Sequence, residues 1–244
     1  MGPEPHPLYA IYHPPLDRGL GGKGIVLCNA LGSESDRSHR SFRVLADSMA
    51  RSGWHVLRFD YRGTGDSSGD ENAAQIGDWI EDIGSAVDEL CAIADLPGAH
   101  LLGLRLGAHL ATATALGRSD IQGLILWDPV ENKPKGAKQP LWNGSTDQPV
   151  PDDFGGTLST TEFERMLIQR ERLITGSGWP AQALVIGSGS IPRPFSEILN
   201  RRIDRLQVEE VDEPPPWLEE SDFGAGPVAA NGIRSITSWT GEGS

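Results

Sequence analysis

Short apolar runs alternate along the chain with longer segments in which apolar residues recur every three or four positions. The runs are nearly continuous in apolar residues, which is typical of parallel strands covered on both faces. Alternation of strands and helices predicts an α/β fold built on a doubly wound, mostly parallel sheet. The predicted strands are residues 24–27, 56–59, 101–104, 123–127 and 183–186.

The helices between these strands are each predicted from one apolar stripe. Phe42 and Met49 belong to the first stripe, and the second runs from Ile76 to Leu90 and stops before a Leu-Pro-Gly sequence. Towards the end of the chain we predict a helix at residues 195–206 and a strand at residues 207–211. A last helix is predicted at residues 232–239, with Asn231 as its N-cap.

The region from residue 131 to residue 175 interrupts this alternation. It is rich in Pro, Gly, Lys and Asp until a Thr161-x-x-Glu164 capping box predicts the start of a helix. An excursion of this length between two strands is either a lid over a site or a loop. With no internal repeat in the sequence, we predict one domain over residues 1–244, with a possible lid-like insertion at residues 131–175.

Composition and charge narrow the class of protein. The chain has 244 residues, 38% of them hydrophobic, which is typical of a globular protein. Its net charge of −13 argues against binding to nucleic acid or to anionic membranes. The sequence shows neither a membrane-spanning run nor a signal peptide. Cys28 and Cys91 lack metal-ligand spacing. We expect a cytoplasmic protein without a metal or cofactor, and the sequence leaves its oligomeric state open.

The carboxyl ends of the predicted strands hold the chemically interesting residues. In open α/β sheets, ligands bind at these ends. One strand runs into a turn at residues 28–33, and the next into a glycine-punctuated loop at residues 60–67. A third passes into a helix through Gly103-x-x-x-Gly107. We therefore expect the functional site where these three loops meet.

This set of loops resembles the α/β-hydrolase fold, and the resemblance covers most of the chain. It rests on RFDYRGTGDS at residues 58–67 and on the GLRLG elbow at residues 103–107. Together with NALG at residues 29–32 and Ser38-His39-Arg40, it is similar more narrowly to bacterial hydrolase-like proteins encoded with exosortase or exopolysaccharide systems. The resemblance implies hydrolase chemistry on acyl substrates, and it implies that Asp60 and Arg62 fix turns.

The elbow departs from the family pattern at its central position. The family carries a serine nucleophile in G-x-S-x-G, whereas this chain has Arg105. A guanidinium is always protonated, so it is neither a nucleophile nor a general base. The family's acid position falls on residues 187–190, which are Gly-Ser-Gly-Ser, and the last of the six histidines is His109. We therefore expect no Ser-His-Asp hydrolysis.

Arg105 itself has two interpretations. With the helix N-terminus at Leu106, it would form a receptor for a carboxylate, phosphate or oxyanion. It could equally be paired with an internal acid, for which Asp128 at the next strand end is the candidate. Backbone groups of the preceding turn are predicted to help bind a substrate: Asn29, Ala30, Leu31 and Ser33.

Other side chains complete the candidate site. His39 or Asp128 would move a proton, although His39 could instead satisfy local backbone and Asp128 could cap a turn. Trp217 would cover the pocket mouth or pack on the surface, and His109 is expected in the core. Two hypotheses follow. The first is an enzyme acting on a small ester, thioester or carboxylate-bearing molecule without a triad. The second is a pseudoenzyme that binds a ligand or a protein partner.

Overall fold

The computed structural model describes residues 1–2, 6–16, 22–70, 73–129, 179–188, 199–218 and 226–242. Its strands are β1 (Ala10–His13), β2 (Lys23–Cys28), β3 (Trp54–Phe59), β4 (Ala99–Leu104), β5 (Ile121–Trp127), β6 (Gln182–Ser188) and β7 (Arg205–Val211). Its helices are α1 (Ser33–Arg51), α2 (Ile76–Ala94), α3 (Leu106–Leu116) and α6 (Ala230–Glu242), with a 3-10 turn, η2, at Pro216–Leu218.

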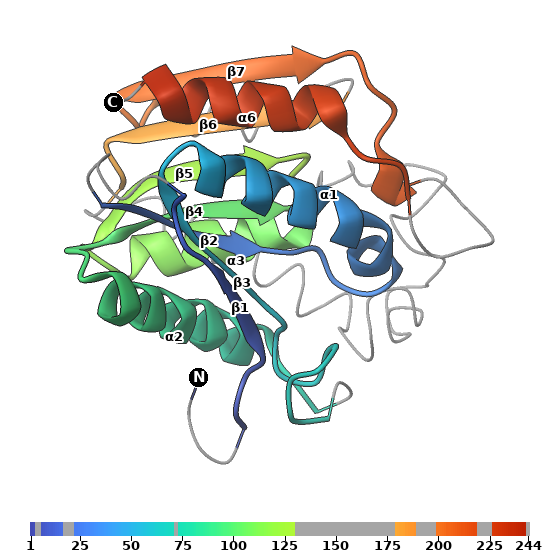
Figure 1. Ribbon diagram of the computed structural model, residues 1–244, viewed down its shortest axis with the longest axis vertical. Helices are drawn as coiled ribbons and strands as arrows, with labels where there is room; N and C mark the ends of the chain where they lie inside the picture. Colours follow the sequence, from blue (N-terminus) through green and yellow to red (C-terminus); the bar gives the residue numbers. More distant parts are fainter. Residues whose placement is uncertain are drawn as a thin grey trace.

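The strands form one sheet in the order β1-β3-β2-β4-β5-β6-β7 (Figure 1). All neighbours are parallel except β1, which runs antiparallel to β3 at the edge. The five strands expected from apolar runs are confirmed within β2 to β6. The sequence analysis missed β1. It has only four residues, all partly buried, and it joins the sheet by pairing with β3, which is distant in the sequence.

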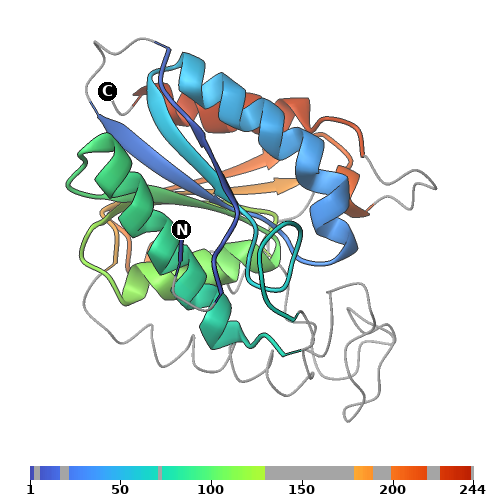
Figure 2. The same ribbon diagram turned by 60° about the horizontal axis from the view of Figure 1, so that its bottom comes forward.

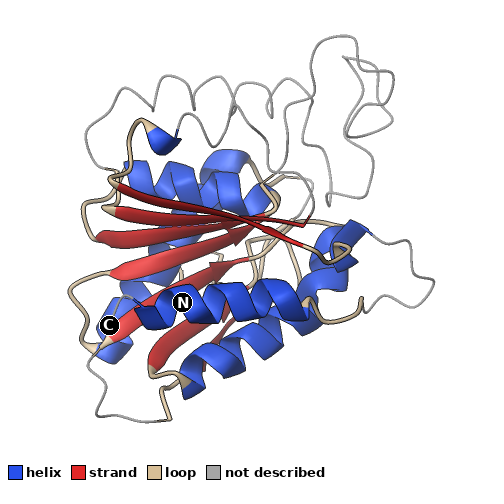
Figure 3. Ribbon diagram, turned by 90° about the horizontal axis from the view of Figure 1, so that it is seen from above, coloured by secondary structure: helices blue, strands red, loops and turns tan. Residues whose placement is uncertain are grey.

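Helices cover both faces of the sheet (Figure 3). One core lies between the sheet and α2 and α3, and contains Trp79, Ile83 and Leu101. The other lies under α1, η2 and α6, and contains Phe42 and Trp127. Figure 2 shows α1 and α2 on opposite sides of β1 and β3. The predicted doubly wound α/β-hydrolase fold is therefore confirmed.

Two predictions for the C-terminal part are wrong. The helix expected to extend to residue 206 does not, because Arg205 and Leu206 already pair with β6 as part of β7. Asn231 does not precede the last helix but lies inside α6. The carboxylate of Glu213 accepts the backbone N–H groups of Asn231 and Gly232 at 3.1–3.2 Å, so a residue distant in sequence satisfies this helix start.

The possible lid at residues 131–175 and the helix expected from Thr161 lie outside the described residues. Among the helices that are described, none combines the length and the apolar character needed to span a bilayer.

Candidate functional site

The elbow lies between β4 and α3, with Arg105 as the single residue that joins them. Arg105 has φ 56° and ψ −118°, a conformation that costs a non-glycine residue free energy. Its backbone N–H donates to the carbonyl of Trp127 at 3.0 Å. A Cβ on Gly107 would collide with the carbonyl oxygens of Cys28 and Asn29. Close packing of α3 against the end of β2 therefore requires glycine and holds the sharp turn in place.

The side chain of Arg105 is held from two directions. Its Nε donates to both carboxylate oxygens of Glu34, at 3.1 and 3.2 Å, and Nη1 donates to the backbone carbonyl of Asp128 at 3.2 Å. The side chain is only 13% exposed. Among the described residues, Nη2 has no acceptor. The guanidinium is thus oriented by an internal acid while part of its donor capacity remains available.

The acid that pairs with Arg105 is Glu34, not the expected Asp128. Glu34 lies in the first turn of α1 and is 8% exposed. Burial raises its pKa, and the charge of Arg105 offsets only part of that rise. The sequence analysis placed the turn at residues 28–33 beside the elbow but did not extend this region to Glu34, which lies in the first turn of α1. The sequence signal that could have identified Glu34 is an acidic residue in the first helical turn after β2, the strand next to β4.

Asp128 follows β5 and binds the end of β6 instead of the guanidinium. Its Oδ1 accepts the backbone N–H of Ser188 at 2.5 Å, and its own N–H donates to the carbonyl of Ile186 at 2.7 Å. Its backbone has φ 43°. Burial raises the pKa of Asp128, and the hydrogen bond from Ser188 opposes this rise. Asp128 therefore accepts a hydrogen bond from Arg105 through its backbone carbonyl oxygen, while its carboxylate interacts with the guanidinium only as a nearby charge.

The turn after β2 is organised by the side chain of Asn29. Its Oδ1 accepts the N–H of Ala30 at 2.9 Å and the hydroxyl of Ser38 at 2.8 Å, and its Nδ2 donates to Ser35 at 2.9 Å. The N–H of Ala30 is therefore occupied, against the expectation that it would face a ligand. No acceptor for the N–H of Leu31 occurs among the described residues.

Leu106 and Ser33 are the first residues of α3 and α1, respectively. Because the first N–H groups of a helix lack intrahelical acceptors, both helix starts can bind an anion. Leu106 directly follows Arg105, so its N–H lies at the elbow itself.

His39 and Trp217 lie elsewhere than the sequence analysis placed them. His39 is exposed and lines a cavity of about 1110 Å³ together with Asp60 and Asp66. Neither Arg105 nor Asp128 is among the described residues that line that cavity. Trp217 is fully buried and packs edge-on against Trp127, with 5.0 Å between ring centroids. Trp217 therefore belongs to the core and covers no surface.

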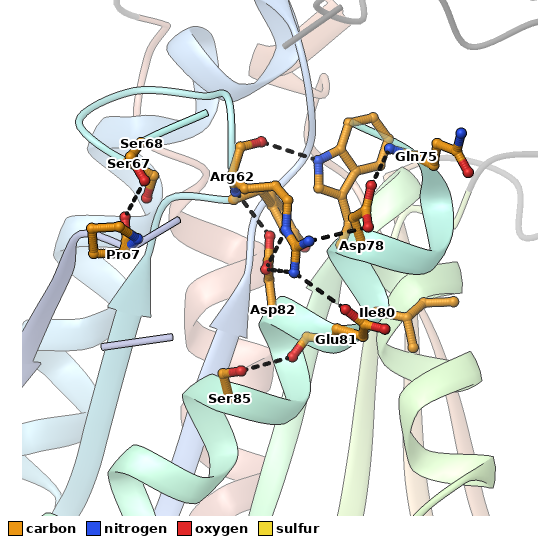
Figure 4. A network of polar contacts seen from close by, with 12 residues as sticks. Pro7, Arg62, Ser67, Ser68, Gln75, Asp78, Ile80, Glu81, Asp82 and Ser85 are labelled. Atoms are coloured by element: carbon orange, nitrogen blue, oxygen red, sulfur yellow. Dashed lines mark hydrogen bonds and ion pairs between the residues drawn. The ribbon is translucent and has the colours of Figure 1, made fainter. Parts of the chain in front are cut away.

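The loop after β3 is built from polar contacts, as the resemblance implied. The carboxylate of Asp60 accepts the N–H of Asp66 at 3.0 Å. Arg62 donates from its backbone N–H and its Nε to Asp82, both at 2.8 Å, and also contacts Asp78 and Glu81 (Figure 4). These contacts tie the loop to α2 and give it a structural role.

Two remaining expectations concern buried groups. His109 is 2% exposed, which confirms it as a core residue. Both cysteines are free thiols, and burial raises the pKa of Cys28. Within the described part of the chain, no three His, Cys, Asp or Glu side chains are grouped so that they could hold a metal ion.

The part of the chain that contains the elbow matches a known protein family. Residues 23–145, half of the chain, match the hydrolase family described as serine aminopeptidase, S33. No curated protein matches the chain.

Similar solved structures include Est1E from Butyrivibrio proteoclasticus with bound ferulic acid, with 16% identity and a TM-score of 0.66 over 96% of this chain and 93% of that one. DcsB in complex with its substrate analogue has 12% identity and a TM-score of 0.67, over 96% of this chain and 95% of that one. XC6422 from Xanthomonas campestris, a serine hydrolase without a lid, has 17% identity and a TM-score of 0.58, over 97% of this chain and 87% of that one.

These structural similarities, all below 25% identity, show the fold. The match of half of the chain to a family model shows the family. The chain belongs to the serine aminopeptidase S33 family of α/β-hydrolases.

Proposed function

We propose that this α/β-hydrolase binds a small ester, thioester or carboxylate-bearing molecule at its elbow and acts on it without a serine nucleophile. One observation carries the proposal. Arg105 occupies the position where the fold presents its reactive residue, and its guanidinium is oriented by Glu34 while Nη2 has no acceptor among the described residues. A fixed guanidinium beside a helix N-terminus is suited to hold a carboxylate or a developing oxyanion.

Asp128 is better placed than His39 to move a proton in such a site. The Asp128 carboxylate is near enough to Arg105 for the guanidinium charge to act on its pKa. His39 instead lines a cavity for which Arg105 is not among the described lining residues. The pKa of Asp128 is raised by burial, and a carboxylate with a raised pKa is a stronger base towards a bound water. The backbone N–H groups of Leu106 and Leu31 are the proposed partners of the substrate oxygen.

A specific contact favours a second candidate, a pseudoenzyme that binds without turnover. Glu34 already neutralises Arg105 and Asp128 already binds Ser188, so the acid groups near the elbow are engaged. In that case the elbow would bind a carboxylate and release it unchanged. The narrower similarity to exosortase-associated proteins and the cytoplasmic location stay predictions.

Thermal unfolding with a panel of acetate, benzoate and ferulate tests the shared part of both candidates. We expect the wild type to gain a few degrees in Tm and Arg105→Ala to gain clearly less, because a ligand that binds only the folded state stabilises it. Arg40→Ala, at an exposed arginine of α1, is the control and should keep the gain. A gain in Arg105→Ala as large as that of the wild type would contradict the proposal.

Activity assays then separate the two candidates. Hydrolysis of p-nitrophenyl esters and acyl thioesters that disappears in both Arg105→Ala and Asp128→Asn supports the enzyme. Rates at background in the wild type support the pseudoenzyme. A fluorophosphonate should leave the chain unlabelled, and a stoichiometric serine adduct would overturn both.

A further inference from the structure

The described cavity of about 1110 Å³ borders the turn after β2 and lies beside the β1–β3 edge of the sheet. Its walls come from β1, β2, β3, the start of α1 and the loop after β3. It is as large as the pockets that hold small organic ligands. Because Arg105 and Asp128 are not among its described lining residues, the function proposed for the elbow does not account for it.

Arg58 is the charged group on the floor of this cavity. Of the four other described arginines that are partly buried, Arg62, Arg105 and Arg118 each form an ion pair with an acid, and Arg37 donates to the backbone carbonyl of Trp217. Arg58 forms none with any described residue, and its one hydrogen bond runs from Nε to Nε2 of His13 at 3.1 Å. Burial lowers the pKa of Arg58 despite the nearby charges of Asp47 and Asp60. A partly buried cation without an acid partner is a position that an anionic ligand would stabilise.

The contact with His13 fixes the direction of this guanidinium. Arginine Nε always carries a proton, so Nε2 of His13 must be the acceptor. The proton of His13 is then on Nδ1, which donates to Oδ1 of Asp47 at 3.1 Å. The chain Asp47–His13–Arg58 uses the Nε side of the guanidinium, and Nη1 and Nη2 have no acceptor among the described residues. Asp60, the other nearby acid, is engaged by the N–H of Asp66.

The surroundings of Arg58 specify the rest of the ligand. Arg58 lies in register with Ile11 on β1 and with Leu27 on β2, so two aliphatic side chains flank it on the same face of the sheet. Phe42 of α1 lines the same cavity. Asp36, Asp60 and Asp66 also line it, and their charges would repel a ligand with two or more negative charges.

We propose that this cavity is a second binding site, for a small amphipathic monocarboxylate whose carboxylate pairs with Nη1 and Nη2 of Arg58 and whose apolar body lies along Tyr9 and Ile11, the accessible apolar side chains of the lining. The site shares the turn after β2 with the elbow as a common wall. It requires no turnover at the elbow, so it holds for either function proposed above.

Calorimetric titration with octanoate tests this site. We expect Arg58→Gln to weaken octanoate binding at least tenfold, since a charge-assisted bidentate contact is lost. Arg51→Gln is the matched control, because Arg51 is exposed on α1 and is not among the described residues that line the cavity, and it should change affinity less than twofold. Octanol and octyl phosphate should bind much more weakly than octanoate to the wild type.

Three results would overturn the proposal: unchanged affinity in Arg58→Gln, octanol binding as tightly as octanoate, or loss of binding in Arg105→Gln with Arg58→Gln unaffected. The last result would place octanoate at the elbow. Should Arg58→Gln fail to fold, phenylglyoxal modification of the wild type gives the answer by mass spectrometry. Octanoate should protect Arg58 and octanol should not, and equal modification of Arg58 with and without octanoate would refute the site.

Discussion

Arg62 and Arg105 follow β3 and β4, the strands on either side of β2, and they differ in how many acids pair with them. Arg62, after β3, meets Asp82, Asp78 and Glu81, and the side chain of Asp82 is fully buried. Although burial opposes the charge, the hydrogen bond and charge of Asp82 raise the pKa of Arg62. Arg105, after β4, has one acid, Glu34, and a backbone carbonyl, and it adopts a strained conformation.

The comparison teaches how to separate a structural arginine from one that is available to a ligand. At Arg62 the donors are satisfied by acids from α2, and the result is a fixed loop. At Arg105 the protein fixes the orientation through Nε, while Nη2 has no acceptor among the described residues, at a backbone position that costs free energy to maintain. A strained backbone conformation at a charged residue whose donors are only partly paired is typical of functional sites.

The largest expected effect is at the fully paired arginine. Asp82→Ala should lower the free energy of unfolding by about 3–5 kcal/mol, because it leaves a buried guanidinium without its main partner. Urea unfolding measures this change. Glu81→Ala is the control: this carboxylate is 71% exposed, so the loss should be below about 1 kcal/mol. Equal losses in both variants would show that burial of the pair does not determine its contribution.

The second effect concerns the packing that holds the elbow. Gly107→Ala should cost roughly 2–3 kcal/mol, because the added methyl group meets backbone carbonyls that cannot move aside cheaply. Gly77→Ala, in the first turn of α2 with nothing within 4 Å of the new methyl group, should be neutral or slightly stabilising in the same urea experiment. A tolerated Gly107→Ala would mean that α3 does not need its close approach to β2.

The smallest effect is a pH dependence at the elbow. A raised pKa means that folded Glu34 holds its proton to higher pH than the unfolded chain does. The free energy of unfolding of the wild type should therefore fall relative to that of Glu34→Gln as the pH rises from about 4.5 through the raised pKa of folded Glu34. The slope should be at most about 1.4 kcal/mol per pH unit. Asp36→Asn, at an exposed residue of the same helix, should show no such difference from the wild type. A flat difference curve for Glu34→Gln would indicate that Arg105 fully compensates the burial of Glu34.

Much of the fold was predictable because the apolar patterns that indicate its strands and helices are local in the sequence. Continuous apolar runs gave β2 to β6, and apolar stripes gave α1 and α2. The loop at residues 60–67 and the Gly103–Gly107 spacing were sufficient to indicate the α/β-hydrolase fold. The short strand β1 and the helix start held by Glu213 were missed, because each depends on a partner far away in the chain.

The sequence by itself determined what this elbow lacks: Arg105 cannot act as a nucleophile, and no histidine follows His109. Only the tertiary structure decided which acid meets Arg105. The crossover order places β2 beside β4, so the helix after β2 brings Glu34 to the guanidinium, while the carboxylate of Asp128 is bound by the N–H of Ser188. Pairing of charges depends on distance in space, and the order of residues along the chain does not record that distance.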